Sequence, residues 1–378
     1  MKVGNLAICL LWLAVVHVNP AFAENGITDS EIVVGSSVSA SGPLGPLGAG
    51  IRDGAAAYFN DVNKQGGVAG RKIRFIALDD AYKIDQTVAN VKKLINDEHV
   101  FALLGNTGTP NVMAALPLAS AANVPLFGPF TGAVELRKDF NRNFFTVTAS
   151  YSEEMEKIIE HITTVGITKI AVVYLNNGFG KSGLAGVEQA MQRRNLKILG
   201  AAPVEANSSD IKKAADVMVK LHPQVIVMAT AGKVTADYIK EHKTRSLSTQ
   251  FYCLSVTSNA QLSSVLGTNT WGLVVSETMP FPWAATSKLI EDYQVAMKSI
   301  NQTEYSYASV QGFLTAKVFV EGLRRAGKNL SREKFIASLE GMSRVDFGGY
   351  QINFSPTNHN GSKYVDLTVL DKEGKFRH

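Results

Sequence analysis

Residues 32–80, IVVGSSVSASGPLGPLGAGIRDGAAAYFNDVNKQGGVAGRKIRFIALDD, decide the fold class. The stretch opens with an apolar strand, passes through a loop rich in glycine and proline, and then places apolar residues at helical spacing from Ile51 to Val62. The glycines of residues 66–70 end that helix and return the chain to a second apolar strand over residues 73–78. The pattern predicts one right-handed βαβ unit, the building block of a doubly wound sheet.

The alternation of strand and helix patterns recurs in two successive blocks. The first block ends near residue 127, and a second block of the same kind begins after residues 144–150. The strands predicted in the second block cover residues 170–175, 197–199, 225–229 and 251–254, with a helix pattern between each pair. This repetition predicts an α/β protein with two doubly wound, Rossmann-like lobes.

The C-terminal part of the chain departs from this alternation. Two long amphipathic helix patterns lead into strand patterns near residue 352 and over residues 364–370. These late strands must complete sheets begun earlier, which three chain crossings near Thr148, Met279 and Phe354 would achieve and which would let the lobes hinge. We therefore expect one lobe from residues 24–147 and 279–353, and the other from residues 148–278 and 354–378.

Residues 1–23 have the composition of a cleaved secretory signal. Lys2 precedes an apolar core, and Ala21-Phe22-Ala23 forms a small-residue cleavage box before Glu24. The core is too short to span a membrane, and no later run is long and apolar enough to do so. We therefore expect cleavage near Ala23, a periplasmic mature chain and no stable membrane insertion. Cys253 is the only cysteine of that mature chain, which excludes an internal disulfide.

Composition and motifs exclude several classes of function. The net charge is +5, but the basic residues are scattered and no aromatic residues are interleaved with them, so we do not expect nucleic-acid binding. The histidines show no metal-binding spacing, and no phosphate-binding glycine motif or G-x-S-x-G elbow is present. No histidine falls in the loops that we assign to the cleft, so a nucleophile would lack its base. We expect a monomeric protein that is not an enzyme and uses neither a metal nor another cofactor.

The best candidate site lies in loops that follow strands. Two facing sets of such loops would form a cleft able to close on a small molecule. In the loop 105–110, Gly108 and Thr109 precede a helix opened by Pro110, and the free N–H groups of a helix start attract carboxylates. The Thr109 hydroxyl could bind such a ligand or could only cap its helix, and spacing alone leaves both readings open. The loop 128–132 offers a second wall.

Several of these segments resemble a known family. Gly42-Pro43 to Gly54, Asn63 to Gly70, Asp79-Asp80 and Gly128-Pro129 resemble the type I periplasmic solute-binding proteins. The likeness is greatest to the branched-chain amino acid (leucine/isoleucine/valine) binding group that serves ABC transporters, and it spans essentially the whole mature chain. The resemblance implies two lobes joined by three crossover segments, a ligand held in the cleft, and delivery to a membrane permease.

The resemblance also implies roles for individual residues. The carboxylate-binding hydroxyl of the family falls on Thr109, and the acid that pairs with the ligand ammonium falls on Ser255. The position usually held by threonine in the amino acid binders is Gly132 here, with a hydroxyl one residue earlier. Leu47 stands where the family often has a bulky neighbour of the ligand. The residues expected to bind ligand are Thr109, Gly108, Phe130, Thr131, Gly132, Phe179, Ser255, Leu47, Tyr307 and Tyr82.

Because a serine replaces the acid, two ligand classes stay open. The first is an amino acid, most simply of the branched-chain type, whose ammonium is met by carbonyls, hydroxyls or an acid elsewhere, since a buried ammonium without a partner is costly. The second is an amine-free aromatic or keto acid packed on Phe130, Phe179 and Tyr307, although Tyr307 could equally serve the core. A sensory ligand-binding module for a membrane receptor is the alternative of another class.

Overall fold

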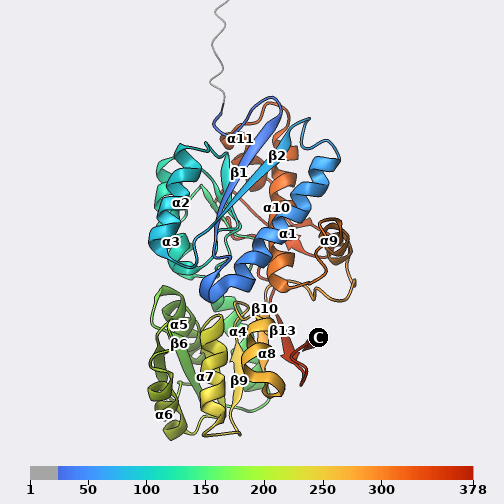
Figure 1. Ribbon diagram of the computed structural model, residues 1–378. Helices are drawn as coiled ribbons and strands as arrows, with labels where there is room; N and C mark the ends of the chain where they lie inside the picture. Colours follow the sequence, from blue (N-terminus) through green and yellow to red (C-terminus); the bar gives the residue numbers. More distant parts are fainter. Residues whose placement is uncertain (1–23, 378) are drawn as a thin grey trace, which may run out of the picture.

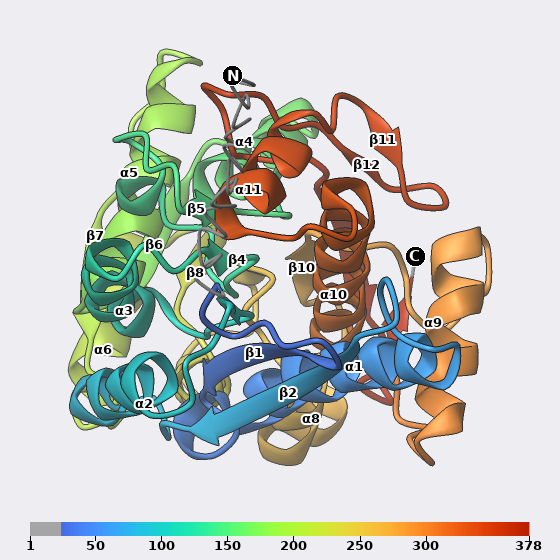
Figure 2. The ribbon, with the colours of Figure 1, turned by 90° about the horizontal axis from the view of Figure 1, so that it is seen from above.

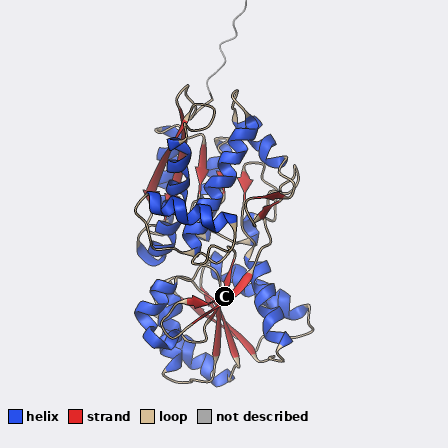
Figure 3. Ribbon diagram, turned by 90° about the vertical axis from the view of Figure 1, so that its right-hand side faces the viewer, coloured by secondary structure: helices blue, strands red, loops and turns tan. Residues whose placement is uncertain are grey.

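The computed structural model describes residues 24–377, so the predicted signal segment 1–23 lies outside the described residues. The protein is α/β and consists of two lobes stacked one on the other (Figures 1 and 3). Each lobe is built round its own sheet, with helices packed against the strands. None of the helices over residues 24–377 combines the length and the hydropathy of a membrane span.

The first lobe contains a five-stranded parallel sheet in the order β2-β1-β3-β4-β5. Its strands are β1 (Glu31–Val38), β2 (Lys72–Asp79), β3 (Ala102–Leu104), β4 (Leu126–Phe127) and β5 (Phe144–Phe145). Figure 2 shows α1 (Gly45–Lys64) on one side of this sheet, and α2 (Ile84–Asn96) and α3 (Thr109–Ala121) on the other. Strand order reverses between β1 and β3, and open α/β sheets bind ligands at such a switch point.

The second lobe contains a seven-stranded sheet in the order β14-β13-β10-β9-β8-β6-β7. Its parallel strands are β6 (Ile170–Leu175), β7 (Ala201–Val204), β8 (Val225–Ala229), β9 (Gln250–Cys253) and β10 (Val274–Glu277), and β13 (Asp366–Leu370) and β14 (Phe376–Arg377) extend it antiparallel. Its helices are α4 (Tyr151–Thr164), α5 (Gly178–Gln192), α6 (Ile211–Leu221), α7 (Lys233–Lys243) and α8 (Asn259–Leu266). All five residues of β8 are buried, as expected for a parallel strand covered on both faces.

The chain passes between the lobes three times. It crosses after β5 to reach α4, and it crosses back after β10 to form α9 (Lys288–Ser299), α10 (Tyr307–Ala326) and α11 (Arg332–Glu340) on the first lobe. After the hairpin of β11 (Val345–Asp346) and β12 (Gln351–Ile352) it crosses again to β13. The three crossover segments of the predicted fold are therefore present, while the lobe boundaries proposed from the sequence stay a prediction.

Helix α10 packs along α1 at very short range (Figure 2). A Cβ atom on Gly54 would overlap the carbonyl oxygen of Ser309, and one on Gly312 would overlap that of Ile51. Only glycine at these two positions lets the two helix backbones approach so closely. The contact fixes the N-terminal end of α10, which carries Tyr307, beside the loop that follows β1.

Two local predictions were wrong. The first helix begins at Gly45, after the short 3-10 helix Gly42–Leu44, because Pro46 stands in its first turn, where a missing N–H costs nothing. Strand β7 covers Ala201–Val204 instead of residues 197–199, and its Pro203 is tolerated because β7 is an edge strand. Spacing left open whether Thr109 caps the next helix, and the structure answers this, because helix α3 begins at Thr109 itself and has Gly108 as its N-cap. Two further 3-10 helices cover Val134–Leu136 and Gly267–Thr270.

Candidate ligand-binding site

A small cavity lies between the lobes at the start of α3, and we call it the hydroxyl cavity. The first lobe contributes the loop that follows β3 and the aromatic side chains of its neighbours, and the second lobe closes the other side. Its lining residues are Leu44, Tyr82, Gly108, Thr109, Phe130, Tyr151, Phe179, Ala231 and Val256. About 10 Å³ is left inside, roughly the room that one water molecule needs.

Three hydroxyl groups meet at this cavity. The Oγ1 atoms of Thr109 and Thr131 lie 2.7 Å apart, and both side chains are buried. Burial raises the pKa of Tyr151, and hydrogen bonding with Thr131 and Thr109 opposes that rise, so the Tyr151 hydroxyl belongs to the same group. Helix α3 takes Gly108 as its N-cap, and no side chain caps its start. Thr109 therefore does not act as a mere cap, and its hydroxyl is directed to Thr131.

Asp80 fixes one wall of the hydroxyl cavity from behind. Its carboxylate is buried and accepts hydrogen bonds from the hydroxyls of Ser37, Ser39 and Thr87. It also accepts the backbone N–H of Tyr82 at 3.0 Å. The Tyr82 ring in turn lies so near Gly108 that a Cβ atom there would come within 2.5 Å of it. Asp80 is therefore a positioning residue.

Ser255 holds a carboxylate that the sequence analysis did not find. Its N–H and its Oγ donate to Glu154 at 2.9 and 3.0 Å, and the Ser276 hydroxyl donates to the same carboxyl at 2.6 Å. Burial raises the pKa of Glu154 to about 7, although these hydrogen bonds oppose the rise. The signal was present: Glu154 falls on the apolar face of α4, beside Tyr151 and Met155, where a charged residue is unusual.

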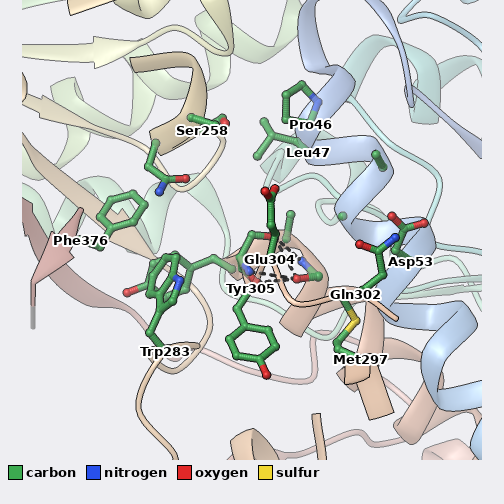
Figure 4. Close-up of a pocket in the computed structure, with 18 of the residues that line it drawn as sticks. Pro46, Leu47, Asp53, Ser258, Trp283, Met297, Gln302, Glu304, Tyr305 and Phe376 are labelled. Carbon is green, nitrogen blue, oxygen red and sulfur yellow. Dashed lines mark hydrogen bonds between the residues drawn. The ribbon is translucent and has the colours of Figure 1, made fainter. Parts of the chain in front are cut away.

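A second and larger cavity of about 450 Å³ lies between the N-terminal ends of α1 and α10 and the loop before α8 (Figure 4). We call it the acidic chamber. It is lined by the carboxyl groups of Asp53, Glu277 and Glu304, and none of its lining residues is lysine, arginine or histidine. Figure 4 shows the rings of Trp283 and Phe376 together on one wall, and their centroids lie 5.7 Å apart.

The structure thus divides the predicted site residues into two groups. The first group, which lines the hydroxyl cavity, is Tyr82, Gly108, Thr109, Phe130 and Phe179. The second group, which lines the acidic chamber, is Leu47, Ser255 and Tyr307. Thr131 and Gly132 line neither cavity, but Thr131 bonds Thr109 and the Gly132 carbonyl accepts the N–H of Tyr151 at 2.7 Å. Sequence reasoning missed Tyr151, Glu154 and the acids of the chamber.

Comparison with known proteins agrees with this architecture. Residues 31–375 match the family model described as periplasmic binding protein. The chain is 22% identical over 299 residues to the Leu/Ile/Val-binding protein of Escherichia coli K12, covering 79% of this chain and 80% of that protein.

Solved structures show the same fold. A substrate-binding periplasmic protein from Ralstonia solanacearum superposes with a TM-score of 0.85 and 31% identity, over 92% of this chain and 99% of that one. A fatty acid ABC transporter substrate-binding protein from Thermomonospora curvata gives a TM-score of 0.84 at 21% identity, over 94% and 92% of the two chains. The chain therefore belongs to the periplasmic binding protein family, in the type I group that includes the Leu/Ile/Val-binding proteins.

Proposed function

We propose that this protein captures a small carboxylate-bearing solute, in the first place an amino acid of the branched-chain type, between its lobes and delivers it to an ABC transporter permease. The observation that carries the proposal is the convergence of Thr109, Thr131 and Tyr151 hydroxyls at the uncapped start of α3. A helix start concentrates partial positive charge and N–H donors, and hydroxyl donors beside it complete a carboxylate-binding site.

The position of this cavity between the lobes supports a carrier. The hydroxyl cavity has walls from both lobes, so a ligand that bound there would be enclosed and would favour the closed form over the open one. A monomer is sufficient for this action, because one chain supplies both walls. A permease that recognises the closed form would then receive only loaded protein.

Buried acids bear on whether the ligand carries an amino group. Two buried carboxyl groups, Glu154 and Glu277, lie at or next to Ser255, where the sequence alone offered no acid. They favour a ligand that carries an ammonium, since a cation near a buried carboxylate recovers part of its desolvation cost.

An amine-free acid is the second candidate. The rings of Tyr82, Phe130 and Phe179 line the hydroxyl cavity and could pack on an aromatic or aliphatic acid. The similar fold of a fatty acid binding protein supports this candidate, because it shows that the architecture accommodates an acid without an amine.

A thermal-shift screen of the mature chain decides between the two candidates. We expect leucine, isoleucine and valine to raise the melting temperature more than the keto acids that carry the same side chains, since a ligand that binds only the folded state stabilises it. Phenylacetate and benzoate test the aromatic acids. A larger shift from the keto or aromatic acids would favour the second candidate, and no shift from any of these acids would contradict the proposal.

Two further measurements address the class of function. We expect the NMR spectrum of the bound solute to be unchanged after long incubation, because a carrier does not transform its ligand, and any turnover would contradict the proposal. In cells of the source organism, deletion of the gene should abolish uptake of the labelled solute. Intact uptake with a lost transcriptional or chemotactic response would instead favour a sensory module.

A further inference from the structure

Three segments join the two lobes and together form the hinge. We call residues 146–150 the first crossing, residues 278–287 the second crossing and residues 353–365 the third crossing. Each lies between an element of one lobe and an element of the other. Because motion between lobes is absorbed by a few connecting residues, the contacts among these three segments decide how the lobes are held relative to each other.

Tyr350 contacts all three crossings through one hydroxyl group. It lies in the turn between β11 and β12, just before the third crossing. Its hydroxyl donates its one proton to a pair of carbonyl oxygens, that of Val147 in the first crossing at 3.0 Å and that of Thr278 in the second at 3.1 Å. Burial raises the pKa of Tyr350, and a hydrogen bond with Ser362 of the third crossing opposes the rise. A bond that favours the ionised phenol is one donated to its oxygen, so Ser362 is the donor.

The hydrogen bonds at Tyr350 form a chain with one direction. The N–H of Tyr364 donates to Ser362 Oγ at 3.2 Å, and the Ser362 hydroxyl donates to Tyr350. Tyr350 in turn donates to the two carbonyl oxygens. Tyr350 is 2% exposed, and Val147, Thr278 and Ser362 are buried with it. In a buried chain each bond polarises the next, and an unmatched polar group is costly, so the chain favours the arrangement in which all its members meet.

Arg137 joins the first crossing to the neighbourhood of the hydroxyl cavity. Its guanidinium donates to the carbonyl oxygens of Thr148 and Ala149 in the first crossing, at 3.0 and 3.1 Å. It also donates to the carbonyl oxygen of Thr131 at 3.2 Å, and Thr131 is one of the three residues whose hydroxyls meet at that cavity. The first crossing is therefore held to the ligand loop on one side and, through Tyr350, to the other two crossings on the other side.

We propose that Tyr350 is a positioning residue for ligand capture: its hydroxyl holds the three crossings together, and with them the arrangement of the lobes in which both contribute walls to the hydroxyl cavity. Loss of the hydroxyl leaves the carbonyl oxygens of Val147 and Thr278 without this donor. A rotation about the hinge that lets water reach these oxygens then becomes easier. The inference goes beyond the proposed function, because it concerns how the lobes are held and its test needs no ligand.

Hydrogen exchange of the ligand-free mature chain, followed by mass spectrometry, tests the proposal. In Tyr350→Phe the amides of the first and third crossings should exchange about fivefold faster or more, because exchange reports the population of opened forms and a lost hydrogen bond raises it by that factor. If the hydroxyl served only to stabilise the core, its loss would speed only the slowest amides, such as those of the buried strand β8. That result, or unchanged exchange in both crossings, would overturn the proposal.

A matched variant separates this role from the loss of any buried phenol hydroxyl. Tyr238 in α7 is fully buried, and its hydroxyl lies 3.3 Å from Nδ1 of His242 in the same helix. Tyr238→Phe should lower stability and leave exchange in the crossings unchanged. Circular dichroism establishes that each variant is folded. Ser362→Ala, which removes the donor from the third crossing, gives a second test if Tyr350→Phe fails to fold, and unchanged exchange in both crossings of that variant would contradict the proposal.

The distance between the lobes gives a second readout. Spin labels attached through Lys92→Cys in α2 and Lys240→Cys in α7, both exposed positions, report this distance, and the native Cys253 is buried and so protected from labelling. Double electron–electron resonance should show a broader distance distribution in Tyr350→Phe than in the parent chain or in Tyr238→Phe. Identical distributions would overturn the proposal.

These measurements separate the inference from the proposed function. If carboxylates fail to bind while Tyr350→Phe broadens the distance distribution, only the proposed function is lost. If carboxylates bind through Thr109 while Tyr350→Phe changes neither exchange nor distance, only the role of Tyr350 is lost.

Discussion

The hydroxyl cavity and the acidic chamber lie between the same two lobes, yet they offer opposite electrostatic environments. Val256 lines the first, while its chain neighbours Ser255 and Thr257 line the second. One cavity presents an uncapped helix start and hydroxyl donors, and the other presents carboxyl groups and aromatic rings. Side chains therefore divide the cleft between the lobes into two cavities, and neighbouring residues of one loop line cavities of different charge.

The largest expected effect comes from Glu154, which lies behind Ser255. Its folded-state pKa of about 7 exceeds the ordinary value of 4.5, so the folded protein binds more protons than the unfolded chain between these pH values. Stability from this group is fully present below pH 4.5 and is lost as the pH rises to 7, by about 3 kcal/mol. We expect Glu154→Gln to remove that loss, as measured by urea unfolding at several pH values.

The free energy of unfolding is compared between wild type and Glu154→Gln at each pH, and the difference separates Glu154 from groups such as His242 that are present in both. His242, whose pKa burial lowers to about 4, has the opposite effect on stability and contributes equally to both proteins. Glu277 contributes a slope of the same sign, and because the charge of Glu154 adds to the rise in the pKa of Glu277, the difference between the curves includes that effect and has the same sign. If the free energy of unfolding depends on pH in the same way in wild type and in Glu154→Gln, the prediction is wrong. Glu154 would then ionise at no cost to stability, and the acidic chamber would be less unfavourable for negative charge than we infer.

The two cavities also differ in how far the sequence predicted them. The glycine loop after β1 and the helix start at Thr109 are local patterns, so the fold and most of the hydroxyl cavity could be predicted from them. Of the acidic chamber, the resemblance indicated Leu47, Ser255 and Tyr307, but local patterns could not predict its acids. Its walls come from α1, residues 255–260, residues 302–309 and Phe376, which only the three crossings bring together. Glu277 ends a buried strand, and no local pattern marks its side chain as part of a cavity.

Thr109 should produce the next largest effect, and it should act on one cavity only. Thr109→Ala removes a hydroxyl that would donate to the ligand carboxylate, and hydrogen bonds to charged groups contribute roughly 1 to 3 kcal/mol. We expect calorimetry to show a carboxylate affinity lowered by that amount. Thr109→Ser retains the hydroxyl and should bind nearly as wild type does. Unchanged carboxylate affinity in Thr109→Ala would remove Thr109 from the site.

The smallest expected effect comes from a hydrogen bond between the two lobes, which bears on both cavities because both lie between the lobes. Gln261 in the second lobe donates from Nε2 to the carbonyl oxygen of Pro43 in the first lobe at 3.0 Å. Gly232 approaches the same oxygen so closely that a Cβ atom there would overlap it. Gln261→Met keeps the length of the side chain and removes the hydrogen bond, at a cost to closure of about 1 kcal/mol.

If closure of the lobes encloses the ligand, Gln261→Met should weaken the carboxylate ligand about fivefold. Calorimetry measures this factor, and small-angle scattering of the loaded variant measures how far closure is lost. Unchanged affinity with unchanged scattering would show that the contact between Gln261 and Pro43 does not hold the lobes together, and that the two cavities keep their shapes without it.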